Sequence, residues 1–374
     1  MKKSLLALAV LGAFAGVASA QSSVTLYGTL DLNGRYVKND GSPRRLSEST
    51  DGINSSQLGF KGIEDLGGGL KAGFVLLAGI NPDVGSTNGK FFNRRSTVSL
   101  MGGFGEVRLG RDYTPTFWNN TLFDAFGTNG VGESNNVKQL TAPNFVRADN
   151  AVGYFLPSGI GGVYGQFMAA AGENTAATNG NTAGSNGNPG YTNTYYGPAG
   201  LFAGSPQNGR YLGGRVGFAS GPFDVAAAYA QETVTLAGDK LKMFNIGGSF
   251  DFGVVKLLGY FDQGKLLSAK DNMFSISAVV PLGQGEIHVG GERSKLTTAS
   301  VSNKVTQFAL GYVYNLSKRT AVYATASRLS NGNDTNGLPS LAVSGVGAFG
   351  SSGAALPTPG GKSTGAEVGI RHFF

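Results

Sequence analysis

The chain has 374 residues, 61 of them glycine, no cysteine and a net charge of +7. So small a basic excess, without a clustered basic stripe, argues against nucleic-acid binding. With no cysteine and only two histidines, neither a zinc site nor another transition-metal site is supported, and no cofactor is expected.

The first twenty residues predict a secretory signal peptide. Met1-Lys2-Lys3 precedes an apolar run, 5–17, and Ala18-Ser19-Ala20 forms a small-residue cleavage site, so cleavage is expected before Gln21. The run is too short to span a bilayer as a helix, and no later segment approaches eighteen apolar residues. A membrane protein of this sequence would therefore be a closed β-barrel, formed by one domain over residues 21–374.

The remaining chain reads as strands with a period of two. In residues 23–37, Val24, Leu26 and Leu30 share one face, while Thr25 and Asp31 share the other. Similar segments recur at 54–65, 70–80, 91–102, 105–114, 147–157, 162–171, 210–220, 223–234, 242–252, 254–265, 271–281, 286–296, 304–315, 319–330 and 362–374. Short Gly- and Pro-rich breaks alternate with longer ones. This pattern predicts an all-β, transmembrane antiparallel β-barrel of sixteen strands with short periplasmic turns and long outer loops.

Three of the long breaks differ in composition. Loops 172–209 and 331–361 are rich in Gly, Asn, Thr and Ser, as expected of solvent-facing segments. The break 115–146 instead contains Phe117, Trp118, Phe123 and other apolar residues. Because apolar side chains need a surface to pack against, we expect this loop to fold against the inner wall of the barrel.

The chain ends in an alternating strand. Ala366, Val368, Ile370, His372 and Phe374 share one face, and the last residue is aromatic. Outer-membrane barrels characteristically end this way, because the terminal strand closes the barrel and is read by the assembly machinery. We expect Phe374, Ile370 and Val368 to form this assembly signal.

Several motifs resemble the general diffusion porins of Gram-negative bacteria, most closely the β-proteobacterial branch. They are Ser23-Val24-Thr25-Leu26-Tyr27-Gly28, the run from Gly59 to Ala72, Phe92-Asn93-Arg94, Leu109-Gly110-Arg111 and the Phe374 end. The resemblance implies an outer-membrane homotrimer of sixteen-stranded barrels. It also implies that the third outer loop, here 115–146, folds into the lumen and sets a constriction.

The function of such a pore depends on which charges point inward. The alternation places Arg35, Lys61, Lys71 and Arg108 on the lumen face, because a lipid-facing Lys or Arg at mid-bilayer costs about 2–4 kcal/mol. Arg94 and Arg95 are adjacent, so alternation alone leaves open which one faces the lumen. The resemblance selects Arg94, with the other side chain in a rim or a subunit contact.

The resemblance implies two further features of the constriction. Arg147 is similar to a second wall arginine of these porins, whereas Gln57 stands where relatives often have a basic residue. Opposite this wall, the loop offers Asp124 and Glu133. These acids either create a transverse field with the arginines or cap turns within the loop.

The expected function is passive diffusion of small hydrophilic solutes and ions, with a mild anion preference. The expected partners are a homotrimer, outer-membrane lipid and lipopolysaccharide, the barrel-assembly machinery, and small solutes and anions. No enzyme is expected, because His288 beside Glu286 fits a solvated pore residue better than a catalytic base. A surface adhesin or receptor using loops 172–209 and 331–361, or a substrate-specific channel, remains the alternative.

Overall fold

The computed structural model describes residues 23–87, 89–141, 144–172, 209–234, 238–299, 302–332, 340–343 and 356–374. The expected signal peptide, 1–20, and most of loops 172–209 and 331–361 lie outside the described residues. Within the described part, no helix is long and apolar enough to cross a membrane. Nor does this part contain a group of three or more His, Cys, Asp or Glu side chains that could hold a metal ion.

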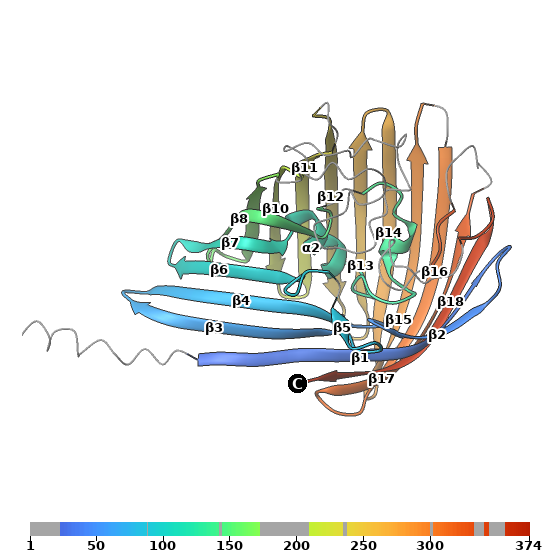
Figure 1. Cartoon of the computed structure of the whole chain (residues 1–374), viewed down its shortest axis with the longest axis horizontal. Coiled ribbons are helices and arrows are strands. Elements are labelled where there is room, and N and C mark those ends of the chain that lie inside the picture. Colours follow the sequence, from blue (N-terminus) through green and yellow to red (C-terminus); the bar gives the residue numbers. More distant parts are fainter. Residues whose placement is uncertain are drawn as a thin grey trace, which may run out of the picture.

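One antiparallel sheet closes on itself into a barrel (Figure 1). Consecutive strands pair along the chain, and β18 returns to pair with β1, so the barrel has no free edge. The strands of the wall are β1 (Ser23–Asn39), β3 (Gln57–Gly67), β4 (Leu70–Asn81), β6 (Arg95–Gly102), β7 (Gly105–Tyr113), β8 (Arg147–Phe155), β9 (Val163–Ala170), β10 (Tyr211–Ser220), β11 (Phe223–Thr233), β12 (Lys240–Asp251), β13 (Lys256–Leu266), β14 (Ala269–Leu282), β15 (Gly285–Thr297), β16 (Ser302–Asn315), β17 (Thr320–Asn331) and β18 (Lys362–Phe373).

These sixteen strands confirm the predicted fold class and strand number. Two short strands were not predicted. β2 (Arg45–Thr50) pairs with the C-terminal half of β1, and β5 (Ser86–Thr87) forms a small hairpin with β4. β2 and β3 pair with successive parts of β1, so together they form one wall strand that is interrupted at residues 51–56.

Two details of the prediction were wrong. Residues 91–94 precede β6 instead of belonging to it, and the break expected at 266–270 is only a two-residue turn, 267–268, at the long-loop rim. Leu267 has a left-handed φ of +51°, a conformation that L residues rarely adopt outside tight turns. The alternation of short and long connections is therefore not strict.

The two faces of the wall have opposite chemistry. On β16, Phe308 is 73% exposed and Leu310 is also exposed. Gln307, the residue before Phe308 on the same strand, points to the other face and is fully buried. The same alternation runs through most strands, with apolar residues outward and Asn, Gln, Ser, Thr and charged residues inward. This is the arrangement of a barrel that meets lipid outside and encloses a polar interior.

The two ends of the described chain close the barrel. The main-chain N–H of Gly28 donates to Phe374 O at 3.1 Å, and Phe374 N donates to Gly28 O at 3.2 Å. Glycine is needed here, because a Cβ on Gly28 would lie 2.3 Å from the Phe374 ring. Val368 and Ile370 lie on the exposed outer face of the same strand.

The loop segment 115–146 contains helix α2 (Pro115–Leu122) and the 3-10 turn η1 (Ser134–Val137). α2 contacts β9, β10, β11 and β12, and η1 contacts β15 and β16 (Figure 1). Leu140 and Phe145 of this segment pack with Leu241, Met243 and Leu296, which are buried residues of the inner wall. Leu140 and Phe145 of the loop segment thus lie among buried residues of the wall strands.

Candidate functional site

Two of the predicted wall arginines meet at one phenol. Arg147 begins β8 and is the direct cross-strand partner of Tyr113, the last residue of β7. Its Nη2 donates to the Tyr113 hydroxyl at 2.9 Å, and its guanidinium lies 4.4 Å from the Tyr113 ring centroid. Arg94 Nη1 donates to the same hydroxyl at 3.4 Å. The structure therefore brings Arg94 and Arg147 together, as the resemblance implies, around a tyrosine that sequence reasoning missed.

Arg94 is also held by a segment that interrupts the wall. Its Nη2 lies 3.4 Å from Asp51 Oδ2. Asp51 has a left-handed φ of +63°, and its Oδ1 accepts the main-chain N–H of Ser56 at 2.7 Å. Asp tolerates the left-handed conformation, and with Oδ1 held by Ser56 the other carboxylate oxygen lies beside Arg94. Asp51 is therefore a second residue of the site that the strand pattern did not reveal.

Residues 51–56, here called the inward turn, are held by hydrogen bonds to Asp31 of β1. The two carboxylate oxygens of Asp31 accept the N–H groups of Gly52, Ile53 and Asn54 at 3.2, 3.0 and 2.8 Å. The Tyr323 hydroxyl also donates to Asp31. Asp31 thus points inward and accepts hydrogen bonds from the backbone of this turn and from Tyr323.

The inward turn also contacts the loop segment 115–146. Gly130 N donates to Asp51 O at 3.0 Å, and Ser55 Oγ donates to Asn129 Oδ1 at 2.8 Å. Gly130 has a φ of +70° and packs so closely that a Cβ would lie 2.1 Å from Gly52 O. The loop and the inward turn therefore hold each other in place beside Arg94.

Arg95, expected in a rim or a subunit contact, instead pairs with the buried Asp112 of β7. Its Nε donates to Asp112 Oδ1 at 2.7 Å, and its guanidinium lies 5.6 Å from the Tyr113 ring centroid. Arg108 shares Asp112 through its Nη1 and pairs with Glu106, its Nε lying 2.8 Å from Glu106 Oε1. Arg94 can join Arg95 on one side of the wall because Arg94 precedes β6 and is free of the strand's alternation.

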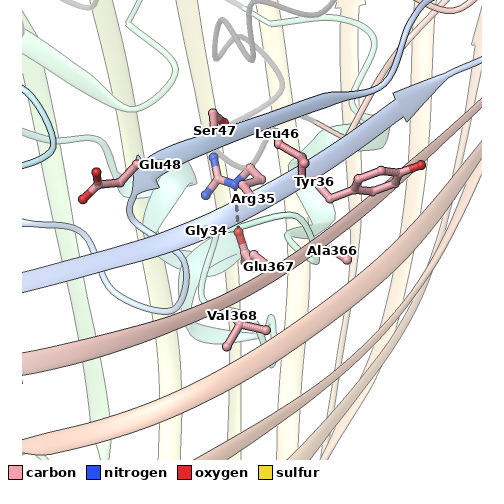
Figure 2. Close-up of a pocket in the computed structure, with 9 residues that line it drawn as sticks. All are labelled: Gly34, Arg35, Tyr36, Leu46, Ser47, Glu48, Ala366, Glu367 and Val368. Atoms are coloured by element: carbon pink, nitrogen blue, oxygen red, sulfur yellow. Dashed lines mark hydrogen bonds and ion pairs between the residues drawn. The ribbon is translucent and has the colours of Figure 1, made fainter.

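Arg35, also predicted in the lumen wall, is sealed in an ion pair. Its Nε lies 2.9 Å from Glu367 Oε2, and Arg35 is only 3% exposed. Figure 2 shows the two side chains pointing toward each other from β1 and β18. Glu367 Oε1 also accepts the N–H of Val131 in the loop segment at 3.1 Å. Arg35 therefore joins β1 to β18 and is not exposed to the water of the lumen.

Lys61 and Lys71 are both exposed, Lys61 in the middle of β3 and Lys71 at the turn end of β4. Lys61 Nζ lies 5.2 Å from the ring centroid of Tyr27, its neighbour on β1. Lys71 pairs in register with Asp65 and with Met101. Through Val75 of β4, Lys61 is level with Thr97, two residues beyond Arg95, whereas Lys71 lies six residues along β4 from Leu77, the cross-strand partner of Arg95.

The two loop acids are buried within the loop segment. Asp124 is 5% and Glu133 1% exposed. Asp124 Oδ1 accepts the N–H of Phe126 at 2.9 Å, and Oδ2 accepts the N–H and hydroxyl of Ser134 at 3.0 and 2.7 Å. Burial raises the pKa of the Asp124 carboxyl, and the Ser134 hydrogen bonds oppose that rise only in part. For Asp124 these contacts match the alternative in which the loop acids cap turns, whereas the Glu133 side chain makes no capping hydrogen bond at η1.

The whole chain is similar to known outer-membrane channels. The model of the Gram-negative porin family matches residues 7–334. Outer membrane porin protein 32 of Delftia acidovorans is 38% identical, with all of both chains covered. An outer membrane porin protein of Bordetella pertussis is 32% identical over 88% of this chain and 95% of its own length.

Solved structures agree with this relationship. An anion-selective porin from Comamonas acidovorans superimposes with a TM-score of 0.77 at 34% identity, covering 95% of this chain and all of its own. Salmonella typhi OmpF, solved in complex with daunomycin, has a TM-score of 0.62 at 17% identity and so shows the fold alone. The chain belongs to the Gram-negative porin family. This confirms the predicted channel class and the predicted location in the outer membrane.

Proposed function

We propose that this porin passes small hydrophilic solutes and ions by diffusion with a mild preference for anions. The observation that carries the proposal is the convergence of Arg94 and Arg147 on Tyr113. Within the described residues, Arg94 has one carboxylate partner, Asp51, and Arg147 has no carboxylate within ion-pairing distance. A positive excess at a narrow point attracts anions and repels cations.

The loop segment 115–146 is the proposed constriction. It folds into the lumen and leaves the passage open on the side of Arg94 and Arg147. Its contacts with inner-wall residues from β10 to β18 support this placement. Because Asp124 and Glu133 are buried in the loop, the proposed field comes mainly from the arginines, with Asp51 as the nearest acid.

Further parts of the proposal concern export and assembly. Residues 1–20 direct secretion and are cleaved before Gln21. Phe374, Ile370 and Val368 are read by the barrel-assembly machinery, and three mature chains form a homotrimer in contact with outer-membrane lipid and lipopolysaccharide. The family membership supports the trimer, and the outward exposure of Val368 and Ile370 supports recognition of the terminal strand.

The experiment is a planar lipid bilayer recording under a KCl gradient with the wild type, Arg94→Glu and the matched outward control Arg328→Glu. We expect an anion-sign reversal potential for the wild type that Arg94→Glu lowers or reverses, because one substitution changes the local charge by two units. Arg328→Glu should behave like the wild type, since Arg328 lies exposed on the outer face of β17. A cation-sign wild type, or an unchanged Arg94→Glu, would remove this arginine from control of selectivity.

A further inference from the structure

A row of lysines crosses five neighbouring strands on the outer face of the barrel, near the long-loop rim. We call it the lysine belt; it consists of Lys240, Lys242, Lys265, Lys270, Lys295 and Lys304. Five of the six are exposed and Lys270 is half-buried. They lie on β12 to β16, which are adjacent in the wall (Figure 1).

The strand register places these like charges directly against one another. Lys242 is paired with Lys265, and Lys265 is in turn paired with Lys270. Lys295 is paired with Lys304. Lys270 pairs with Thr297 and therefore lies diagonal to Lys295, which bridges the two groups. Like charges directly opposite in a sheet are destabilising, so such a row calls for an external counter-charge.

The protein supplies little counter-charge at this level of the outer face. Asp262, Asp271 and Glu292, which lie on the same five strands, all belong to the buried inner face. Asp251 and Glu286 lie at the opposite ends of their strands, and Asp239, which directly precedes Lys240, is half-buried. Within the described residues, none of the six lysines forms an ion pair.

An aromatic row lies directly beneath the lysine belt on the same face. Phe244 is two residues from Lys242, and Phe274 is four from Lys270; both are exposed. Phe261 lies between them, with ring centroids 6.4 Å from Phe244 and 4.8 Å from Phe274. At roughly 3.3 Å per residue along a strand, cations and aromatic rings are separated by about the depth from a lipid headgroup to its first acyl carbons.

We propose that the lysine belt binds the anionic, phosphate-bearing headgroup of an outer-leaflet lipid, whose acyl chains pack on Phe244, Phe261 and Phe274. The proposal rests on the proposed contact with outer-membrane lipid and assigns it to one sector of the barrel. Charge complementarity selects a polyanionic headgroup, and the adjoining apolar band selects a lipid over a soluble anion. The lipid would neutralise the cross-strand repulsion between the lysines.

The test uses native mass spectrometry of the full-length mature porin in micelles containing bis-phosphorylated lipid A or phosphatidylcholine. The variants are Lys242→Gln/Lys265→Gln/Lys270→Gln and, as a matched control at the opposite rim, Lys256→Gln/Lys318→Gln/Arg319→Gln. We expect the wild type and the control to retain lipid A in preference to phosphatidylcholine. The belt variant should retain it about tenfold less, since each cation near an anionic lipid surface contributes to binding.

Equal retention of lipid A by the belt variant and the wild type would overturn the proposal, as would an equal loss in the control. A shifted reversal potential with unchanged lipid binding would also overturn it, because the lysines would then act on ions at the pore mouth. If the wild type lacks anion selectivity but binds lipid A through the belt, the proposed selectivity fails and this site stands.

A second variant and a salt series cover the case in which the belt variant does not fold. Lys242→Arg/Lys265→Arg/Lys270→Arg keeps the charges and should retain lipid A. For the wild type, raising the salt from about 0.1 M to about 1 M shortens the screening length from about 10 Å to about 3 Å and should release the lipid. Lipid A that stays bound throughout this series would show apolar binding and contradict the assignment.

Discussion

Three guanidinium groups surround Tyr113. Those of Arg147 and Arg94 donate to its hydroxyl, and that of Arg95 lies over its ring. Three like charges around one side chain repel one another, and the phenol oxygen, the π face of the ring and the carboxylates of Asp51 and Asp112 offset this repulsion. The tyrosine therefore acts as a positioning residue. It holds the arginines at the wall in a fixed arrangement and lets their charge be felt in the pore.

Replacing Tyr113 with Phe should weaken anion selectivity without abolishing it. The ring and its cation–π contacts remain, but the hydroxyl that accepts from Arg147 at 2.9 Å is lost. A hydrogen bond to a charged group contributes about 1.5–3 kcal/mol, enough to release the Arg147 side chain. The reversal potential under a KCl gradient should fall toward zero, while Tyr312→Phe on the outer face should leave it unchanged. A Tyr113→Phe channel as selective as the wild type would show that the hydroxyl does not position the arginines.

Gly28 should tolerate no side chain. In Gly28→Ala, the new Cβ would lie 2.3 Å from the Phe374 ring and 2.5 Å from Gln57 O. Overpacking of this kind typically costs about 1–3 kcal/mol, and here it would separate β1 from the chain terminus. Gly34→Ala is the matched control on the same strand, because a Cβ there meets nothing within 4 Å. Urea unfolding of the refolded porin should show a lower midpoint for Gly28→Ala alone; equal midpoints would contradict this account of the closure.

At the scale of elements, carboxylates of the wall hold the loop segment 115–146 by its backbone. Asp271 accepts the N–H groups of Gln139 and Leu140 at 2.8 and 3.0 Å. Glu232 accepts the N–H of Asn144 at 3.1 Å, and Glu367 accepts that of Val131. Buried backbone donors need such partners, because they are removed from bulk water. The wall carboxylates thus supply hydrogen-bond acceptors for backbone N–H groups of the loop segment.

Asp271→Ala should loosen the loop and enlarge the pore. The substitution leaves two buried N–H groups without their acceptor, at a cost of about 1–3 kcal/mol each. We expect larger and noisier single-channel conductance steps in planar bilayers. Asp251→Ala is the control, because Asp251 caps only the exposed Gly253 at the turn rim. Conductance equal to the wild type would mean that the other anchors suffice to hold the loop.

At the scale of the whole molecule, one buried pair joins the first strand, the last strand and the loop. Arg35 on β1 contacts Glu367 on β18, and Arg35 Nη2 also donates to Thr50 O at 3.1 Å. Removing one partner of a buried pair is far more costly than removing both, because it leaves an uncompensated charge. The barrel closure should therefore depend on the pair as a unit.

This leads to a double-mutant cycle. Arg35→Met alone and Glu367→Leu alone should each destabilise the barrel by about 3–5 kcal/mol. Arg35→Met/Glu367→Leu should recover most of this loss, since neither buried charge remains. Glu48→Ala, which removes an exposed acid of β2, should be nearly neutral. Denaturant midpoints of the refolded proteins provide the measurement, and additive effects of the two single substitutions would show that the residues do not act as a pair.

Much of this architecture was predictable because a barrel wall has a strictly local signature. Alternation assigned the strands, and the inward placement of Asp31, Arg35 and Arg108 followed from the cost of charges in lipid. The inward turn and the position of Arg95 could not be predicted. The chain leaves regular strand geometry at Asp51 and before β6, and there a period of two no longer orients side chains.

The sequence by itself determined the fold class, the strand number and the family, since each depends on periodicity and motifs that neighbouring residues carry. Only the tertiary structure decided which charges act together. Arg94 and Tyr113 lie at the open end of the β6–β7 hairpin while Asp51 comes from the inward turn, and Arg35 and Glu367 are 332 positions apart. Their roles depend on closure of the barrel and on how the loop segment packs, and these are long-range contacts that no local pattern encodes.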